Sequence, residues 1–333
     1  MRFLVTGTAG FIGFHLARRL LAEGHTVTGI DGVTPYYDVA LKEARNDILA
    51  GEPNYRLYRL MLEDGPALND AATEADPDIV IHLAAQAGVR YSLEQPRAYI
   101  DSNIIGTFNL VEFCRHHPVR HLLIASTSSA YGGNTKMPFA ETDPAVHPLT
   151  IYAASKSASE LIAHSYAHLW RIPTTVFRLF TVYGPWGRPD MALFKFTAAM
   201  LAGTPIDIFN NGLMTRDFTY IDDAVAAIIR LVDEIPAEGV PVGTADTVSP
   251  VAPYRLVNVG GGAPVPLMEF IAAIERALGI TAQRRYLPMQ PGDVPNTRAS
   301  AELLETLTGS RPTTSVETGV RAFVEWYRDY FQV

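Results

Sequence analysis

Apolar runs and amphipathic stretches alternate at the start of the chain. Residues 3–5 form a short apolar run, residues 14–21 carry apolar side chains at helical spacing up to Gly24, and residues 26–30 form a second apolar run that ends at Asp31. Short apolar runs flanked by turn residues indicate buried strands, and the 3.6-residue spacing indicates a helix. The pattern therefore predicts a strand–helix–strand unit.

The same alternation continues to about residue 180. The expected helices cover residues 39–49, 66–75, 103–116 and 151–170, and the expected strands cover residues 55–62, 79–83, 121–125 and 174–180. Strands that alternate with helices across short polar connections favour an α/β fold with a Rossmann-type, doubly wound parallel sheet. Ligands of such sheets bind beyond the carboxyl ends of the strands.

The pattern changes after Phe180, where prolines and glycines cluster at 183–189 and the later elements look less regular. We therefore expect a smaller C-terminal α/β substrate lobe that covers a cofactor. The expected division is a Rossmann domain at 1–179, a substrate lobe at 180–333, and two segments that return to the first domain, 218–233 and 254–260. Residues 236–253 read as a surface loop.

The bulk composition limits the class of protein. Of 333 residues, 48% are hydrophobic and 19% are charged, as in an ordinary globular enzyme, and the formal net charge of −8 argues against nucleic acid or an anionic membrane as partner. Cys114 is the one cysteine, which excludes an intramolecular disulfide and a cysteine-rich metal site. A strand at once follows Met1, and no apolar run could span a bilayer, so we expect a cytoplasmic protein without bound metal.

The turn between the first strand and helix contains Gly7, Gly10 and Gly13. Glycines at this spacing allow a tight turn and let the backbone approach a pyrophosphate at the positive end of the helix. Asp31, at the end of the second strand, is placed to accept hydrogen bonds from an adenosine ribose, and its charge would repel a 2′-phosphate. The unit therefore predicts an NAD site rather than an NADP site.

A candidate for acid–base chemistry follows further along the chain. Tyr152 and Lys156 are four residues apart on a predicted helix and so share one face. An ammonium group and a nicotinamide cation both favour a phenolate and should lower the pKa of Tyr152 from its usual value of ~10. Thr127, at the end of the strand at 121–125, could share the substrate's hydroxyl proton with Tyr152. We therefore predict that Tyr152 is the general base.

Several motifs together resemble the extended short-chain dehydrogenase/reductase family, the NAD-dependent epimerases and dehydratases. They are the glycine turn, Leu83-Ala84-Ala85, Asn103 with Gly106-Thr107, the segment 126–132, and Tyr152 with Lys156. The resemblance runs over almost the whole chain, and the sugar-nucleotide members begin by oxidising C4 of a hexose. It implies these cofactor contacts: Gly7, Gly10, Phe11, Ile12, Gly13, Asp31, Leu62, Leu83, Ala84, Ala85, Asn103, Tyr152 and Lys156. It also implies a homodimer formed through the helices at 103–116 and 151–170.

The residues after Thr127 narrow the reaction. Dehydratases of the family carry an Asp-Glu pair at this point and nucleotide-glucuronate decarboxylases carry a Glu two positions after the Thr, whereas this chain has Ser128 and Ser129. Elimination therefore has no obvious proton carrier. Epimerisation, in which a hydride leaves C4 and returns to it, is favoured, with Thr127, Ser128 and Ser129 beside the sugar.

The loop 181–192 is similar to that of UDP-glucuronate 4-epimerases, as are the segments 31–38, 211–223 and 289–294. An arginine offers a planar fork that suits the carboxylate of glucuronate, so Arg188 is the candidate for that group, against the alternative of an ion pair at the cleft rim. Arg90 has a weaker claim. The resemblance implies these substrate contacts: Arg90, Thr127, Ser128, Ser129, Thr181, Arg188, Ile206, Phe209, Arg216 and Asp293. Among them, Arg216 would bind the diphosphate, Asp293 a ribose hydroxyl, and the main chain at 206–209 the uracil.

The expected reaction is thus the conversion of UDP-glucuronate to UDP-galacturonate through a 4-keto intermediate. Decarboxylation of UDP-glucuronate, epimerisation of UDP-glucose, and a non-catalytic NAD-binding regulator stay open as alternatives. Met61 departs from the family pattern, because relatives commonly have an Asp there that contacts the adenine.

Overall fold

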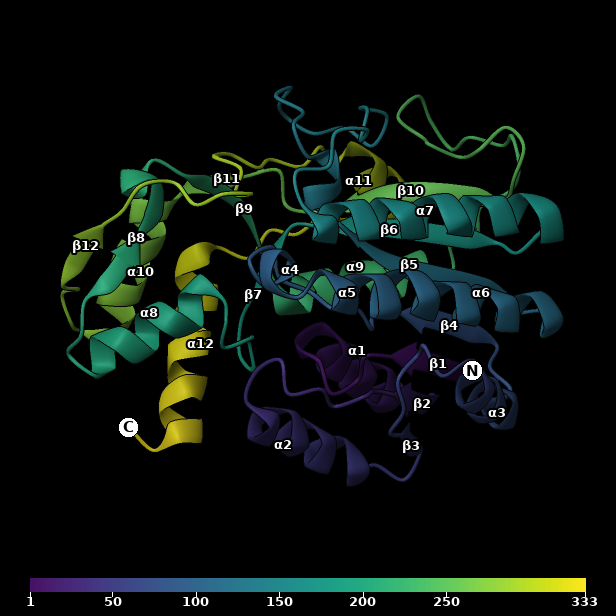
Figure 1. The fold of residues 1–333 in the computed structure, drawn as a ribbon, viewed down its shortest axis with the longest axis horizontal. Helices are drawn as coiled ribbons and strands as arrows, with labels where there is room; N and C mark the ends of the chain where they lie inside the picture. Colours follow the sequence, from purple (N-terminus) through teal and green to yellow (C-terminus); the bar gives the residue numbers. More distant parts are fainter.

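The computed structural model describes residues 1–333 and contains a seven-stranded sheet in which every pair of neighbours is parallel (Figure 1). The strand order is β10-β6-β5-β4-β1-β2-β3. The strands are β1 (Arg2–Thr6), β2 (Thr26–Ile30), β3 (Tyr55–Tyr58), β4 (Ile79–His82), β5 (His121–Thr127), β6 (Thr174–Leu179) and β10 (Tyr254–Val259). This order confirms the Rossmann-type doubly wound sheet, and the order reverses beside β1, where such folds bind their ligands.

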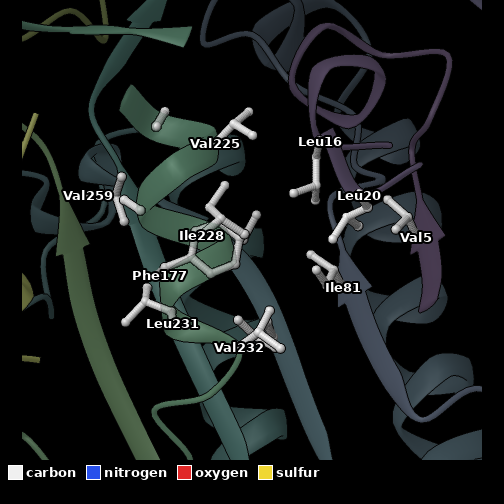
Figure 2. Close-up of a cluster of buried hydrophobic side chains, with 14 of the residues drawn as sticks. Val5, Leu16, Leu20, Ile81, Phe177, Val225, Ile228, Leu231, Val232 and Val259 are labelled. Carbon is white, nitrogen blue, oxygen red and sulfur yellow. The ribbon is translucent and has the colours of Figure 1, made fainter. Parts of the chain in front are cut away.

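Helices cover both faces of this sheet. One face carries α1 (Phe11–Ala22), α2 (Val39–Ala50), α9 (Ile221–Leu231) and α11 (Glu302–Thr308), and the other carries α3 (Gly65–Ala75), α6 (Gly106–His116) and α7 (Ile151–Trp170). Figure 2 shows the hydrophobic core between the sheet and the first of these two helix layers. Leu16 and Leu20 of α1 face Ile81 of the sheet, and Ile228 of α9 lies near Phe177. Burial of these apolar faces fixes both helix layers on the strands.

The predicted helix at 103–116 is part of a longer helical run. The short helices α4 (Tyr91–Glu94) and α5 (Pro96–Tyr99) lead into a π-helical turn at Ile100–Ile105, which continues as α6. Asn103 lies inside the π-helical turn. Such turns interrupt the regular α-helix, and here the side chain of Asn103 is bonded to Gln86, in the loop that follows β4.

The predicted strand at 55–62 is shorter in the structure, because β3 ends at Tyr58. Beyond it the chain turns inward, with Leu62 buried and its carbonyl oxygen accepting a hydrogen bond from Asn109 Nδ2 at 2.8 Å. Asp64 then caps α3 by accepting from the amide of Ala67. Leu60 and Met61 therefore lie outside the strand, and their apolar side chains line the cleft.

A second, smaller group of elements lies beside the sheet (Figure 1). It contains the strands β7 (Thr181–Tyr183), β8 (Ile206–Ile208), β9 (Thr215–Tyr220), β11 (Pro264–Pro266) and β12 (Arg284–Tyr286), and the helices α8 (Ala192–Leu201), α10 (Leu267–Leu278) and α12 (Val316–Phe331). A separate core of 18 buried residues joins its three helices to β8. The expectation of less regular elements after Phe180 was wrong here, because α10 and α12 are regular amphipathic helices.

None of the helices has both the length and the apolar character needed to cross a membrane.

Candidate active site

A cleft of about 1010 Å³ opens at the carboxyl ends of the strands and extends into the second group of elements. Almost all residues expected to bind ligand line it: Gly7, Gly10, Phe11, Ile12, Gly13, Asp31, Leu62, Leu83, Ala84, Ala85, Arg90, Thr127, Ser128, Ser129, Tyr152, Lys156, Thr181, Arg188, Ile206, Phe209, Arg216 and Asp293. Asn103 is the exception. Residues that are far apart in the sequence thus meet around one cavity.

The glycine turn leaves no room for side chains. Gly7 has φ +84°, and a Cβ there would lie 2.8 Å from the amide nitrogen of Ala84. A Cβ on Gly13 would lie 2.0 Å from the carbonyl oxygen of Gly7. Gly10 caps α1 without a side-chain hydrogen bond, so the first amides of the helix stay free of side-chain acceptors. These three positions form a bare backbone cradle at a helix N-terminus, which fits a pyrophosphate.

The carboxylate of Asp31 is held by the backbone on both sides. Oδ2 accepts from the amide of Ala9 at 2.9 Å, and Oδ1 accepts from the amide of Val33 at 2.7 Å. Both oxygens keep lone pairs for further donors, as a carboxylate accepts about four hydrogen bonds. Asp31 therefore joins the glycine turn to the end of β2 and can still accept from a ribose.

Met61 replaces a polar contact with an apolar one. Its sulfur lies so close to Gly32 that a Cβ on Gly32 would be 2.1 Å from it. Together with Leu62, Met61 gives the cleft an apolar wall next to Asp31. A flat adenine ring can pack on such a wall without the hydrogen bond that an Asp would supply.

Asn103 does not reach the cleft. Its Oδ1 accepts from the amide of Gln86 at 2.7 Å, and its Nδ2 donates to the carbonyl oxygen of Gln86 and to Ser155 Oγ. All its bonding groups are thus occupied within the protein. It fixes Gln86, which does line the cleft, against the helix that carries Tyr152, and its contact with the cofactor stays a prediction.

Thr127 ends β5 and starts a short 3₁₀ turn at Ser128–Tyr131, with its Oγ1 accepting from the amide of Ser129 at 3.1 Å. Tyr152 and Lys156 lie one turn apart on α7, which begins behind the Thr150 cap. These elements place Thr127, Tyr152 and Lys156 along the wall of the same cleft. The structure therefore places the predicted catalytic residues together.

Burial dominates the electrostatics of this pair. It lowers the pKa of Lys156 to about 8, against the charge of Glu160, which raises it. Burial also raises the pKa of Tyr152, against the hydrogen bond with Thr127 and the charge of Arg188, which lower it. The chain's own groups therefore do not produce the lowered pKa of Tyr152 that the sequence suggested, because desolvation outweighs them.

A buried ion pair between Arg178 and Glu160 lies next to Lys156 and to the strand end that carries Thr127. Arg178 on β6 donates from Nε and Nη2 to the two oxygens of Glu160, at 2.9 and 2.6 Å. Glu160 also accepts from the hydroxyl of Ser126, next to Thr127. Because Glu160 lies one helical turn beyond Lys156, it joins the ends of β5 and β6 to the helix that carries Tyr152.

Arg188 already has a carboxylate partner. Its Nε donates to Asp190 Oδ1 at 2.9 Å and its Nη2 to Asp190 Oδ2 at 2.5 Å, and the hydroxyl of Tyr36 donates to Oδ2 at 3.0 Å. Burial would raise the pKa of Asp190, but the charge and hydrogen bonds of Arg188 outweigh it and hold that pKa below its ordinary value. The sequence pattern did not indicate Asp190 and Tyr36 as partners of Arg188, although an acid two residues after Arg188 was a visible signal.

The far end of the cleft is basic and aromatic. The guanidinium of Arg90 lies 4.8 Å from the ring centre of Phe209, and its Nη2 lies 3.7 Å from Asp293 Oδ2. Arg216 donates to the carbonyl oxygens of Thr215 and Pro295, and burial lowers its pKa. An aromatic face with two arginines suits a base and a diphosphate.

No group of three or more metal-ligating side chains is present in the structure. The comparisons with known proteins agree with the nucleotide-binding character of the cleft. Residues 3–243 match the model of the NAD dependent epimerase/dehydratase family. The chain belongs to this family.

Members of the family with similar sequences and structures have been described. A protein of Rhizobium meliloti named a probable UDP-glucuronate 4-epimerase is 58% identical over 98% of this chain and 97% of its own length. A UDP-glucuronate 4-epimerase of Arabidopsis thaliana is 42% identical over 98% of this chain and 77% of its own length.

Among solved structures, the UDP-glucuronic acid 4-epimerase of Bacillus cereus in complex with UDP-glucuronic acid and NAD has a TM-score of 0.89 and 32% identity, over 99% of this chain and 100% of that chain. A UDP-glucose 4-epimerase of Thermotoga maritima with UDP-glucose has a TM-score of 0.86 and 28% identity, with the same coverage of both chains. The architecture is therefore shared by epimerases of acidic and of neutral sugars.

Proposed function

We propose that this family member catalyses the NAD-dependent epimerisation of UDP-glucuronate to UDP-galacturonate at C4. The similarity to UDP-glucuronate 4-epimerases in sequence and in structure supports this reaction. The observation that carries it within the chain is the grouping of Tyr152 and Lys156 with Thr127 in a cleft that Arg188 also lines. This grouping offers a base for the C4 hydroxyl and a cation for the C6 carboxylate.

The residues around the bare glycine cradle would hold the cofactor. Gly7, Gly10 and Gly13 fit its pyrophosphate, and Asp31 fits a ribose, as their geometry allows. When bound, NAD would supply a hydride acceptor and the positive charge of its nicotinamide ring. The adenine would lie against Met61 and Leu62.

In the reaction itself, Tyr152 would take the proton of the C4 hydroxyl, which it shares with Thr127. The ammonium of Lys156 would favour the phenolate, because its pKa of about 8 leaves it mostly charged at neutral pH. Arg90, Phe209, Arg216 and Asp293 would hold the UDP while the sugar ring turns and presents its other face. Ser128, Ser129 and Thr181 would contact the sugar from the opposite wall.

The acids nearest to Tyr152 and Lys156 argue against elimination. Asp190 and Glu160 are the carboxylates whose charges act on Tyr152 and Lys156, and each is bound to an arginine. A carboxylate in a bidentate ion pair is a poor proton carrier, because protonation would cost it those bonds. The site therefore supports oxidation and reduction at one carbon.

The test is the product formed by the purified holoprotein. Incubation with UDP-glucuronate should give UDP-galacturonate without carbon dioxide, and incubation with UDP-glucose should give little UDP-galactose. Pentose with carbon dioxide would indicate a decarboxylase, and galactose as main product would indicate a UDP-glucose epimerase. Absence of any product with retained NAD would indicate a regulator.

We further propose a homodimer, a cytoplasmic location, and a division into an NAD-binding domain at 1–179, with 218–233 and 254–260, and a substrate lobe. For the dimer, α6 and α7 run side by side and expose large apolar side chains: Phe108, Leu161, Leu169 and Trp170. A soluble monomer seldom exposes such a group on adjacent helices. The division into domains is supported by the separate cores of the sheet and of the second group.

A further inference from the structure

The ion pair between Arg188 and Asp190 affects how strongly Arg188 can bind the sugar carboxylate. The expected role of Arg188 was a free cation that binds a carboxylate with its planar fork. In the structure, two of its five N–H donors go to Asp190, and both side chains are mostly buried, with 21% and 26% exposed. Asp190 therefore neutralises the charge of Arg188 before any substrate carboxylate arrives.

Tyr36 fixes this pair in place. Its hydroxyl donates to Asp190, and burial raises the pKa of Tyr36 to about 12, so the hydroxyl keeps its proton at neutral pH. Tyr36 comes from the loop after β2, whereas Arg188 and Asp190 follow β7. The contact thus joins the sheet domain to the second group of elements across the cleft.

A row of aromatic rings connects this contact to the catalytic tyrosine. Tyr36 packs on Tyr91 with ring centres 4.9 Å apart, Tyr91 on Tyr99 at 6.3 Å, and Tyr99 on Tyr152 at 6.0 Å. The hydroxyl of Tyr99 donates to the carbonyl oxygen of Ala87 at 2.9 Å, which fixes the middle of the row. The distance between Arg188 and Tyr152 is therefore set by packed, rigid groups.

We propose that Asp190, held in place by Tyr36, is a positioning residue whose charge weakens the hold of Arg188 on the sugar carboxylate. The inference rests on the proposed function and deepens it. The 4-keto sugar must turn over between its oxidation and its reduction, and its carboxylate must leave its first position as the ring turns. A fully charged, free guanidinium would bind that carboxylate strongly and hold the ring in one orientation. A guanidinium neutralised by Asp190 binds it weakly enough to release it.

The strength with which Arg188 binds a carboxylate depends on its charge. A hydrogen bond between two ions is about twice as strong as one between neutral groups, and the gain is largest in a buried site. Ground-state binding of this kind lowers Kd without lowering the barrier. Removing the charge of Asp190 should therefore tighten binding of the acidic sugar and slow its turnover.

The experiment compares wild type with Asp190→Asn, by calorimetric Kd values for UDP-glucuronate, UDP-glucose and UDP and by kcat with UDP-glucuronate. In Asp190→Asn we expect the ratio of Kd for UDP-glucuronate to Kd for UDP-glucose to fall about tenfold, with kcat lower and Kd for UDP unchanged. A ratio that stays the same or rises, or a higher kcat, would overturn the proposal.

Two further variants separate charge from structure. Tyr36→Phe keeps both charges and removes only the hydroxyl, so we expect the ratio of Kd values to stay within about twofold while kcat falls. A tenfold fall of the ratio in Tyr36→Phe would show that charge is not the cause. Glu43→Gln removes a bidentate carboxylate from the exposed Arg59, away from the cleft, and should change neither quantity. If wild type makes no UDP-galacturonate, the proposed function fails; if only the Asp190→Asn result differs, this inference alone fails.

Discussion

A Cβ atom on Gly13 would lie 2.0 Å from the carbonyl oxygen of Gly7, so these two residues determine how closely α1 approaches the end of β1. We therefore expect Gly13→Ala to displace the turn and abolish NAD retention. NAD released from denatured protein measures this directly. Gly51→Ala is the matched control, because its Cβ would meet its nearest atom at 3.4 Å. Retention of NAD by Gly13→Ala would contradict the assignment of the cradle.

Tyr152→Phe should remove the base and leave the cavity intact. We expect kcat to fall by about a hundredfold or more, the usual contribution of a positioned general base. NAD content and Kd for UDP should stay at wild-type values, because the ring stays packed on Tyr99. Turnover near the wild-type rate would exclude Tyr152 as the base.

The pH dependence of kcat should report on Lys156. Its pKa is lowered to about 8 by burial, so its ammonium is present below that pH and is lost as the pH rises through it. We expect kcat to fall above about pH 8, and the fall to begin at lower pH in Glu160→Gln, because Glu160 raises this pKa. Lys136→Met, at an exposed lysine outside the cleft, should leave the profile unchanged. If Glu160→Gln leaves the pH profile of kcat unchanged, the fall of kcat is not caused by deprotonation of Lys156.

Three buried histidines should make the fold sensitive to acid. Burial lowers the pKa of His82 to about 3 and those of His15 and His121 to about 4, whereas unfolded histidine titrates near ~6.5. As the pH falls from ~6.5 toward these values, the unfolded state binds more protons than the folded state, so the free energy of unfolding decreases. Each histidine contributes up to about 1.4 kcal/mol per pH unit.

Urea unfolding at about pH 7 and about pH 5 measures this loss. His82→Gln should reduce the dependence on pH, because one titrating group is removed. The exposed His116 offers the control, and His116→Gln should show the wild-type dependence. Equal stability of the wild type at both pH values would be inconsistent with neutral, buried histidines.

The proposed dimer depends on the exposed apolar side chains of α6 and α7. Leu161 is 71% exposed, and we expect Leu161→Glu to convert a dimer to a monomer in sedimentation experiments, because a charge would be buried in the interface. Val240→Glu, at a side chain 60% exposed in the loop at 236–253, should not change the mass. A monomeric wild type would refute the proposal.

The sequence predicts the sheet well, because its strands are short apolar runs and its helices carry regular apolar faces. The sequence also singled out the glycine turn, Asp31, Tyr152 and Lys156, since local geometry dictates those residue types. The structure gathers them around one cleft, and their roles stay predictions. The end of β3 was not, because Leu60 and Met61 are as apolar at a cleft wall as they would be in a strand.

Contacts between segments that are distant in the sequence were the main features that the sequence did not predict. The pairing of Tyr36 with Asp190 joins residues 154 positions apart, and no local pattern indicates it. The role of Asn103 was likewise hidden, because an amide that binds Gln86 and one that binds a ligand look the same in sequence. The pKa of Tyr152 could not be predicted either, since it depends on burial.

The position of β10 limits how this protein can be altered. This strand forms one edge of the main sheet, next to β6, although half of the elements of the second group, β7, α8, β8 and β9, precede it in the chain and the other half follow it. The polypeptide therefore passes back and forth between its two parts, and no single cut separates them. The whole second group therefore cannot be exchanged for that of a relative as one continuous segment of the chain. We expect successful redesign, in the laboratory or in evolution, to proceed through individual substitutions along the cleft.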